Sequence, residues 1–274
     1  YYIPYFASLL NIEDYKSAEK LARKIAKIYP KSLNYQLEVG IAQEKSGNSK
    51  KAQRTYKKLF ENLNGQQSQA INLANTFSRY EMYEDALNVY LLLEKINTKA
   101  NFSIQKAQLY ENLGKVDLMI EEYLNELVYN AKQKKMVMAK VQLFLNNNGI
   151  KSERNYQLVK KALLPHVRNE QGRTDFSEML IWLFMQNAQY EMALRQAKAL
   201  DKRTNSEGEG VYDLGESFLD KKEYQLAVEA YDYILEKGKN SFLVIEANIN
   251  KLYALTKMLS EQQKQVSELD NIYQ

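Results

Sequence analysis

Side chains that could act as nucleophiles, metal ligands or proton carriers are scarce in this sequence of 274 residues. There is no cysteine, which excludes a thiol nucleophile, a disulfide framework and a cysteine zinc site. His166 is the single histidine, so a histidine-based metal site is nearly excluded and most acid–base mechanisms lack their usual residue. We expect His166, which lies beside Pro165, to be structural or solvated.

Two short motifs resemble parts of chemical sites. Gly208-Glu209-Gly210 is similar to the start of a phosphate-binding loop, but the Gly-Lys-Ser/Thr that completes such a loop is missing and no strand precedes it. We expect a loop between repeats there. Glu121-Glu122 is a carboxylate pair for which we expect a solvated helix face. Because no catalytic constellation is found, the sequence predicts a chain that is not an enzyme and uses no cofactor or metal.

Charge is unevenly distributed along the chain, although the net charge is only +4. Residues 128–175 carry ten Lys and Arg against three acidic residues, whereas residues 176–236 carry twelve acidic residues against six basic ones. The basic stretch includes a candidate patch of Lys132, Lys134, Lys135, Lys160 and Lys161. Two interpretations stay open: a solvated surface of varying charge, or a basic band for an acidic or phosphate-rich partner beside an acidic band for a basic one.

The elements that must position these residues are indicated by small residues that recur every 34 positions. They are Ala18, Ala52 and Ala86, and later Ala193 and Ala227. An aromatic or small residue follows four positions on, and an aliphatic residue follows three further on. This spacing is one face of an α-helix. A second helical stripe precedes each small residue, as in Val39-Gly40 and Leu214-Gly215, so the unit is two amphipathic helices joined by a tight turn. Gly47 and Gly114 mark two of these turns.

With these residues the chain resembles the tetratricopeptide repeat (TPR) family. The best-matching unit contains Val211, Leu214-Gly215, Phe218, Tyr224, Ala227, Tyr231 and Ile234, and Pro30 matches the family's closing proline. The resemblance implies an all-α, right-handed superhelical solenoid of antiparallel helix pairs with about 7–8 repeats. In such an array neither helix buries its apolar stripe alone, so each repeat depends on its neighbour.

The repeat slips in the middle of the chain. Met119 follows Ala86 by 33 residues and precedes Ala193 by 74. We therefore expect three parts: TPR-like repeats over 1–127, a divergent basic repeat over 128–172, and TPR-like repeats with end helices over 173–274. Helices are expected near Lys135–Asn147 and Glu153–Val167, with a turn at 146–149. Pro165 should end or kink the second of these helices.

The resemblance also implies that the first helix of each pair lines a concave groove. The predicted groove residues are Asn75, Arg79, Glu178, Trp182, Tyr212, Glu216 and Asp220. Trp182 has two open interpretations, a binding hot spot or a packing residue. The C-terminal groove is acidic, opposite to the basic clamp of the chaperone-tail-binding members. The positions that read bases in pentatricopeptide repeats hold Leu37, Ile71, Ile104, Glu178 and Tyr212, so a nucleic-acid partner is not expected.

The function predicted from this resemblance is a non-enzymatic protein–protein interaction scaffold that binds a peptide or protein segment in the groove. Alternatives are a targeting or substrate-recruiting arm of a larger enzyme or of a secretion or assembly complex, and a self-assembly module that forms a homodimer. The sequence starts at Tyr1 rather than Met, so we expect it to be part of a longer protein. No apolar run is long enough for a membrane span. The partner's identity and the compartment, cytoplasm or bacterial periplasm, stay open.

Overall fold

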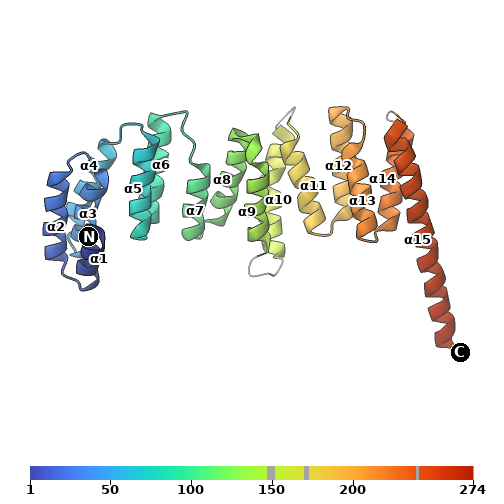
Figure 1. Ribbon diagram of the computed structural model, residues 1–274, viewed down its shortest axis with the longest axis horizontal. Helices are drawn as coiled ribbons and strands as arrows, with labels where there is room; N and C mark the ends of the chain where they lie inside the picture. The colour runs from blue at the N-terminus through green and yellow to red at the C-terminus, as the bar shows by residue number, and fades with distance from the viewer. Residues whose placement is uncertain (147–151, 170–172, 239–240, 274) are drawn as a thin grey trace. The chain divides into compact units, whose positions relative to one another are not determined.

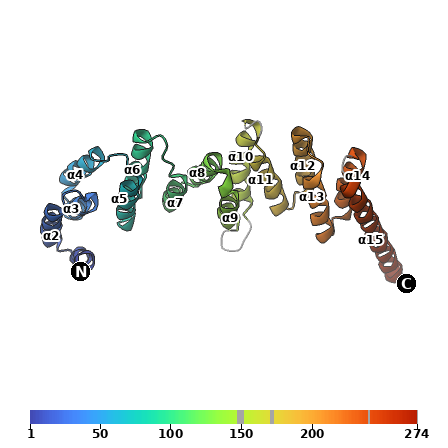
Figure 2. The same cartoon turned by 45° about the horizontal axis from the view of Figure 1, so that its top comes forward.

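The computed structural model describes residues 1–146, 152–169, 173–238 and 241–273, and these residues form helices joined by short links. The described part contains fifteen α-helices, one 3-10 turn and no strand. The chain divides into two compact units, Tyr1–Gln133 and Lys134–Gln274. Within each unit the two helices of a pair lie side by side (Figures 1 and 2). The predicted all-α solenoid of antiparallel helix pairs is therefore confirmed, with seven pairs and a long final helix in the described residues.

The first unit holds four helix pairs and the 3-10 turn. They are α1 (Tyr2–Asn11) with α2 (Tyr15–Ile28), α3 (Leu33–Lys45) with α4 (Ser49–Glu61), α5 (Gln67–Arg79) with α6 (Tyr83–Ile96), α7 (Ser103–Asn112) with α8 (Val116–Tyr129), and η1 (Ala131–Gln133).

The second unit holds three helix pairs and the long final helix. They are α9 (Lys134–Leu145) with α10 (Glu153–Asn169), α11 (Asp175–Gln186) with α12 (Tyr190–Thr204), α13 (Glu209–Asp220) with α14 (Tyr224–Lys237), and α15 (Ser241–Tyr273).

The divergent repeat has the two helices that the sequence predicts. Helices α9 and α10 occupy the expected positions, whereas most of the expected turn at 146–149 lies outside the described residues. The sequence predicts that Pro165 ends or kinks its helix. It does not end the helix, because α10 continues through it to Asn169, and the kink stays a prediction. Pro165 lies one turn from the end of α10, so the helix loses only one backbone hydrogen bond there. The three-part division of the chain stays a prediction.

Most of the residues that the repeat pattern selects lie in the core. The five alanines spaced by 34 residues, listed above, are all 0% exposed. At two pairs the first helix carries a glycine against a tyrosine of the second helix. A Cβ at Gly40 would lie 2.3 Å from the Tyr56 ring, and one at Gly215 would lie 2.7 Å from the Tyr231 ring. Only glycine lets the aromatic ring lie this close to the helix backbone.

The turn inside each pair repeats one backbone conformation. Six described turns contain a residue with positive φ: Glu13, Gly47, Glu81, Gly114, Ala188 and Lys222. The next amide donates to the carbonyl five residues earlier, as in Asn48 to Gln43 at 2.9 Å and Met82 to Phe77 at 3.1 Å. This is the hydrogen bond of a Schellman motif, which ends one helix and starts the next at a fixed angle. The sequence marks only Gly47 and Gly114, because the other four residues are not glycines.

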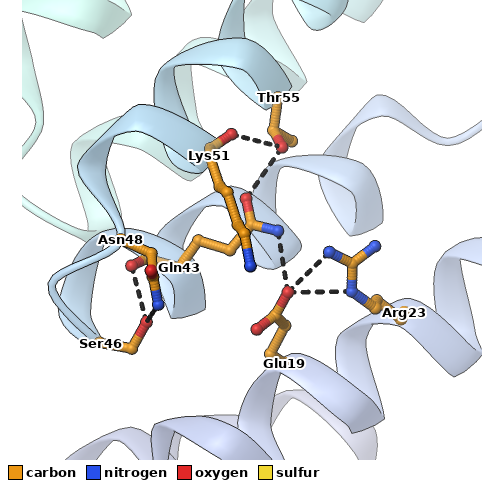
Figure 3. A network of polar contacts seen from close by, with 7 residues as sticks. All are labelled: Glu19, Arg23, Gln43, Ser46, Asn48, Lys51 and Thr55. Carbon is orange, nitrogen blue, oxygen red and sulfur yellow. Dashed lines mark hydrogen bonds and ion pairs between the residues drawn. The ribbon is translucent and has the colours of Figure 1, made fainter.

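Polar contacts connect neighbouring helices across the first two pairs (Figure 3). Gln43 of α3, 2% exposed, donates to Glu19 of α2 at 2.9 Å and accepts from Thr55 of α4 at 3.0 Å. Arg23 donates to the same oxygen of Glu19. One buried amide thereby satisfies its hydrogen-bonding groups on both flanking helices, which fixes the relative position of α2, α3 and α4.

A buried ion cluster corrects one expectation from the sequence. Glu121 is exposed as expected, but Glu122 is only 9% exposed and pairs with Lys106 at 3.1 Å. Lys106 of α7 also contacts Glu94 of α6 at 2.9 Å. Burial lowers the pKa of Lys106, but the two carboxylates outweigh it, so that its pKa lies above the ordinary value. The carboxylate pair on α8 is therefore split between a solvated residue and a residue that holds three helices together.

Candidate functional site

An acidic stripe follows the exposed side of α13. It consists of Glu209, Asp213, Glu216 and Asp220, at spacings of four, three and four residues, and all four are exposed. This spacing places them on one helix face. Within the described residues, no Lys or Arg forms an ion pair with these four carboxylates. The stripe contains the predicted groove residues Glu216 and Asp220.

The carboxylates of α11 differ from those of the α13 stripe, because basic residues of the chain form ion pairs with them. Lys134 forms an ion pair with Glu178, and Arg173 lies 3.1 Å from Asp175. Burial raises the pKa of Glu178, but the contact with Lys134 outweighs it, so the pKa lies below the ordinary value. Trp182 on the same helix is half-buried, which leaves both interpretations of it open. The predicted acidic groove is thus unneutralised on α13 only.

Tyr212, another predicted groove residue, is held by neighbouring helices. Asn250 of α15 donates to its hydroxyl at 3.0 Å, and its ring lies 5.7 Å from that of Tyr231. Burial and the adjacent Glu216 raise the pKa of the Tyr212 hydroxyl. Tyr212 therefore contributes to the packing of α13, α14 and α15, whatever else it contacts.

The two predicted groove residues of the first unit lie on α5. Asn75 and Arg79 are exposed, and Arg79 lies near the buried carboxylate of Glu38. Glu38 is 2% exposed and accepts from the Tyr2 hydroxyl at 2.7 Å. Burial raises the pKa of Glu38 above its ordinary value, against the opposing effects of Tyr2 and Arg79. Arg79 thus compensates a buried charge of its own unit.

The predicted basic patch is divided by the structure. Lys132 belongs to the first unit, and the other four lysines belong to the second. Lys134 is engaged with Glu178, and the ammonium of Lys160 lies over the rings of Tyr156 and Phe184 at 5.6 and 5.5 Å. Lys135 and Lys161 are exposed. Two of the five lysines are therefore committed to contacts inside the second unit.

The two remaining chemical motifs have structural roles. His166 stacks on Phe176, with ring centroids 4.7 Å apart, in agreement with a structural histidine. Gly208 is the N-cap of α13 with φ of +99°, whereas Glu209 and Gly210 form the first turn of that helix. The expectation of a loop over all three residues is therefore wrong for the last two, because a helix begins directly after the left-handed glycine.

A cavity that sequence reasoning missed lies between α11, α12 and α13. Its volume is about 570 Å³, within the range of ligand pockets. Its walls combine acidic, hydroxyl and apolar side chains: Thr174, Glu178, Ile181, Ala197, Leu200, Asp201, Thr204, Ser206, Gly210, Asp213, Leu214 and Ser217. We call it the α12 cavity. Asp213 belongs both to this cavity and to the acidic stripe of α13.

The α12 cavity adjoins a pair in which the large and the small residue have exchanged places relative to the pair that follows. Ala197 stands 34 residues before Tyr231, and Ile181 stands 34 residues before Gly215. In the pairs α3–α4 and α5–α6 the equivalent tyrosine reaches the following repeat: Tyr56 lies 5.6 Å from Phe77 and Tyr90 lies 4.7 Å from Phe102, between ring centroids. Ala197 has no ring to make this contact, and it lines the cavity instead. This difference in residue size could have been found in the sequence by comparing equivalent positions of neighbouring repeats.

A buried carboxylate forms part of the cavity wall. Asp201 is 5% exposed, and its Oδ2 accepts from the Tyr233 hydroxyl at 2.6 Å and pairs with Lys237. Its Oδ1 has no hydrogen-bond partner among the described residues. Burial raises the pKa of Asp201, but Lys237 and Tyr233 outweigh it, and the pKa lies below the ordinary value. Asp201 is therefore charged at neutral pH. Its Oδ1 makes no direct hydrogen bond, although the Ser206 hydroxyl lies close enough to help lower the pKa of the carboxyl group.

Comparison with known proteins gives likenesses in fold only. No family model matches the sequence, and no curated protein matches it. A TPR protein from Parabacteroides merdae is similar with a TM-score of 0.32 and 15% identity, over 92% of this chain and 97% of that one. YrrB, a TPR protein with an unusual peptide-binding site, is similar with a TM-score of 0.32 and 15% identity, over 70% and 97%. A structure of Naa15/Naa10 bound to HypK-THB has a TM-score of 0.34 and 14% identity, and this chain spans 39% of the matched chain.

At these identities the likeness concerns the arrangement of helix pairs. The described residues themselves show the 34-residue period, the buried small residues and the recurrent turn, which together define a degenerate, TPR-like helical repeat. No described helix is both long enough and apolar enough to cross a membrane.

Proposed function

We propose that this chain is a non-enzymatic scaffold that binds an extended, positively charged protein segment along α13 of its second unit. The observation that carries the proposal is the stripe of four exposed acidic side chains on α13 that no described base neutralises. Carboxylates on one face at helical spacing attract a basic segment and fix its position along the helix. The half-buried Trp182 on α11 offers an aromatic contact in the same unit.

A comparison within the second unit supports this choice of surface. On α11 the chain's own Lys134 and Arg173 occupy the carboxylates, and a basic partner would have to displace them. On α13 no Lys or Arg of the described residues occupies the stripe. A partner therefore gains more from the α13 stripe, because its charges replace water and ions rather than an existing ion pair.

Binding of a synthetic peptide tests the proposal. A labelled peptide of alternating Lys and Ala residues should bind, and its binding should weaken as the salt concentration rises. The triple variant Glu209→Gln/Glu216→Gln/Asp220→Asn should bind it about tenfold more weakly at low ionic strength. Fluorescence anisotropy measures both affinities.

A charge-matched control separates the stripe from the total charge of the protein. Glu111→Gln/Asp117→Asn/Glu121→Gln removes three exposed carboxylates from the first unit and should leave the affinity nearly unchanged. Equal weakening in the two triple variants, or no binding of the Lys-Ala peptide by the unaltered chain, would contradict the proposal. A Glu-Ala peptide serves as the negative probe.

The other functions considered from the sequence stay predictions. These are a recruiting arm of a larger enzyme or of a secretion or assembly complex, self-assembly into a homodimer, and contact of the basic stretch with an acidic or phosphate-rich partner.

A further inference from the structure

The α12 cavity is an open pocket of the second unit that combines an apolar and a polar wall. Its apolar wall consists of Ile181, Ala197, Leu200 and Leu214, and its polar wall carries three carboxylates and four hydroxyl groups. Leu200 is partly exposed here, whereas its equivalents Leu59 and Leu93 are 0% exposed. The apolar wall is thus core surface that the exchange of Tyr for Ala has uncovered.

The charges of the cavity indicate what it would hold. No lysine or arginine side chain is among its wall residues. Lys134 and Lys237 approach two of the three carboxylates, but Asp213 has no basic partner among the described residues. Oδ1 of the buried Asp201 makes no direct hydrogen bond among the described residues, and only the hydroxyl of Ser206 lies beside the carboxyl group. A group that donates several hydrogen bonds and carries positive charge would supply what this wall lacks.

We propose that the α12 cavity binds the side chain of a lysine or arginine of the partner segment, with its aliphatic stem against the apolar wall and its charged head toward Asp213 and Asp201. This inference rests on the proposed function, because the segment must first lie on the α13 stripe. Asp213 belongs to both surfaces, which connects the stripe to the cavity. A long basic side chain buries its methylene groups while its head stays at the polar side.

The length of the basic side chain tests the inference separately from its charge. The Lys-Ala peptide is compared with the same peptide made with 2,4-diaminobutyrate, which has the same charge at pH 6 and a stem shorter by two methylene groups. The unaltered chain should bind the lysine peptide about tenfold more tightly. Only the longer stem can cover the apolar wall and also bring the charged head group to the carboxylates.

Two cavity-filling variants are expected to abolish this preference. Ile181→Gly/Ala197→Tyr installs the glycine–tyrosine pair found at Gly215 and Tyr231. Gly210→Leu adds a side chain at a wall residue of the cavity, and a Cβ there would meet no heavy atom within 4 Å, so the change is expected to narrow the cavity without a clash at the backbone. Neither change alters the charge of the protein. Both variants should bind the two peptides with equal affinity, and Gly210→Leu answers the question if the double variant does not fold.

The outcomes distinguish the two proposals. A lysine preference in the unaltered chain that disappears in the filled variants supports the cavity site. Equal binding of both peptides by the unaltered chain, or a preference that survives in a folded filled variant, overturns the cavity site and leaves the stripe proposal standing. If neither peptide binds, the stripe proposal fails, and the cavity inference fails with it.

Discussion

Two helix pairs of the second unit use the same repeat positions in opposite ways. In the pair α13–α14 a glycine of the first helix accommodates Tyr231 of the second, which is 0% exposed. In the pair α11–α12 the equivalent residues are Ile181 and Ala197, and a cavity of about 570 Å³ adjoins them. The comparison shows that a degenerate repeat keeps its helices when two core positions change size together. What changes is the space toward the next pair.

The largest expected effect concerns the closed pair. Tyr231→Ala should lower the free energy of unfolding by about 3–5 kcal/mol, because it removes a fully buried aromatic side chain. Gly215→Ile should also destabilise, by about 1–3 kcal/mol or more, since even a Cβ would lie 2.7 Å from the ring. Urea unfolding followed by circular dichroism measures both changes.

The double variant Gly215→Ile/Tyr231→Ala reproduces the residues of the open pair. Its loss of stability should be smaller than the sum of the two single losses by about 1–3 kcal/mol, because the isoleucine occupies space that the tyrosine has left. Strict additivity of the two changes would refute the view that these positions act as a size-matched pair.

A smaller effect is expected from the buried carboxylates of the two units, Glu38 and Asp201. Asp201→Asn should destabilise at pH 7 by about 3 kcal/mol, because Lys237 then lacks its buried counter-ion. Glu38→Gln should cost less, because burial already disfavours the charged form of Glu38, and the amide oxygen can still accept from Tyr2. Unfolding experiments on both variants measure this difference.

The pH dependence of these two contributions has opposite signs. The pKa of Asp201 is lowered by folding, so its contribution is present above the ordinary value of 3.8 and is lost as the pH falls through the lower folded value. The pKa of Glu38 is raised, so its contribution is present below 4.5 and is lost as the pH rises through the higher folded value. Titration of both carboxyl groups by NMR would contradict this assignment if their pKa values shifted in the same direction.

The smallest expected effect concerns the recurrent turn. Ala188 has a φ of 54°, a conformation that favours glycine, so Ala188→Gly should raise the stability by about 0.5–1 kcal/mol. Gly47 has a φ of 81° at the equivalent position of another repeat, and Gly47→Ala should lower the stability by a similar amount. Thermal unfolding measures both changes in stability. If both variants were stabilised, or both destabilised, strain at φ would not be what decides the stability of these turns.

Much of the fold could be predicted because the repeat pattern is local. The alanines at intervals of 34 residues and the stripes around Gly40 and Gly215 identify both helices of a pair and the faces that they bury. The divergent helices α9 and α10 were also placed correctly. The left-handed positions at Glu81 and Lys222 could not be recognised in the sequence, because neither residue is a glycine.

Less of the candidate site could be predicted. The acidic character of α13 was expected. That the carboxylates of α11 are paired with basic residues, whereas those of α13 are not among the described residues, was not. That Lys134 neutralises Glu178 could not be read from the sequence, because the two residues are 44 positions apart and meet only when α9 packs near α11. The burial of Glu122 beside Lys106 has the same origin, since a charged residue on a helix shows no sign of its tertiary partner.

The sequence by itself determined the helix pairs, their period and the residues of their shared core, because helical periodicity and side-chain size act within a few residues of each other. Only the tertiary structure decided which charges neutralise one another, which carboxylates are buried, and that the exchange at Ile181 and Ala197 leaves a cavity. These properties depend on distances between helices, and such distances are set by the simultaneous packing of residues that lie far apart in the chain.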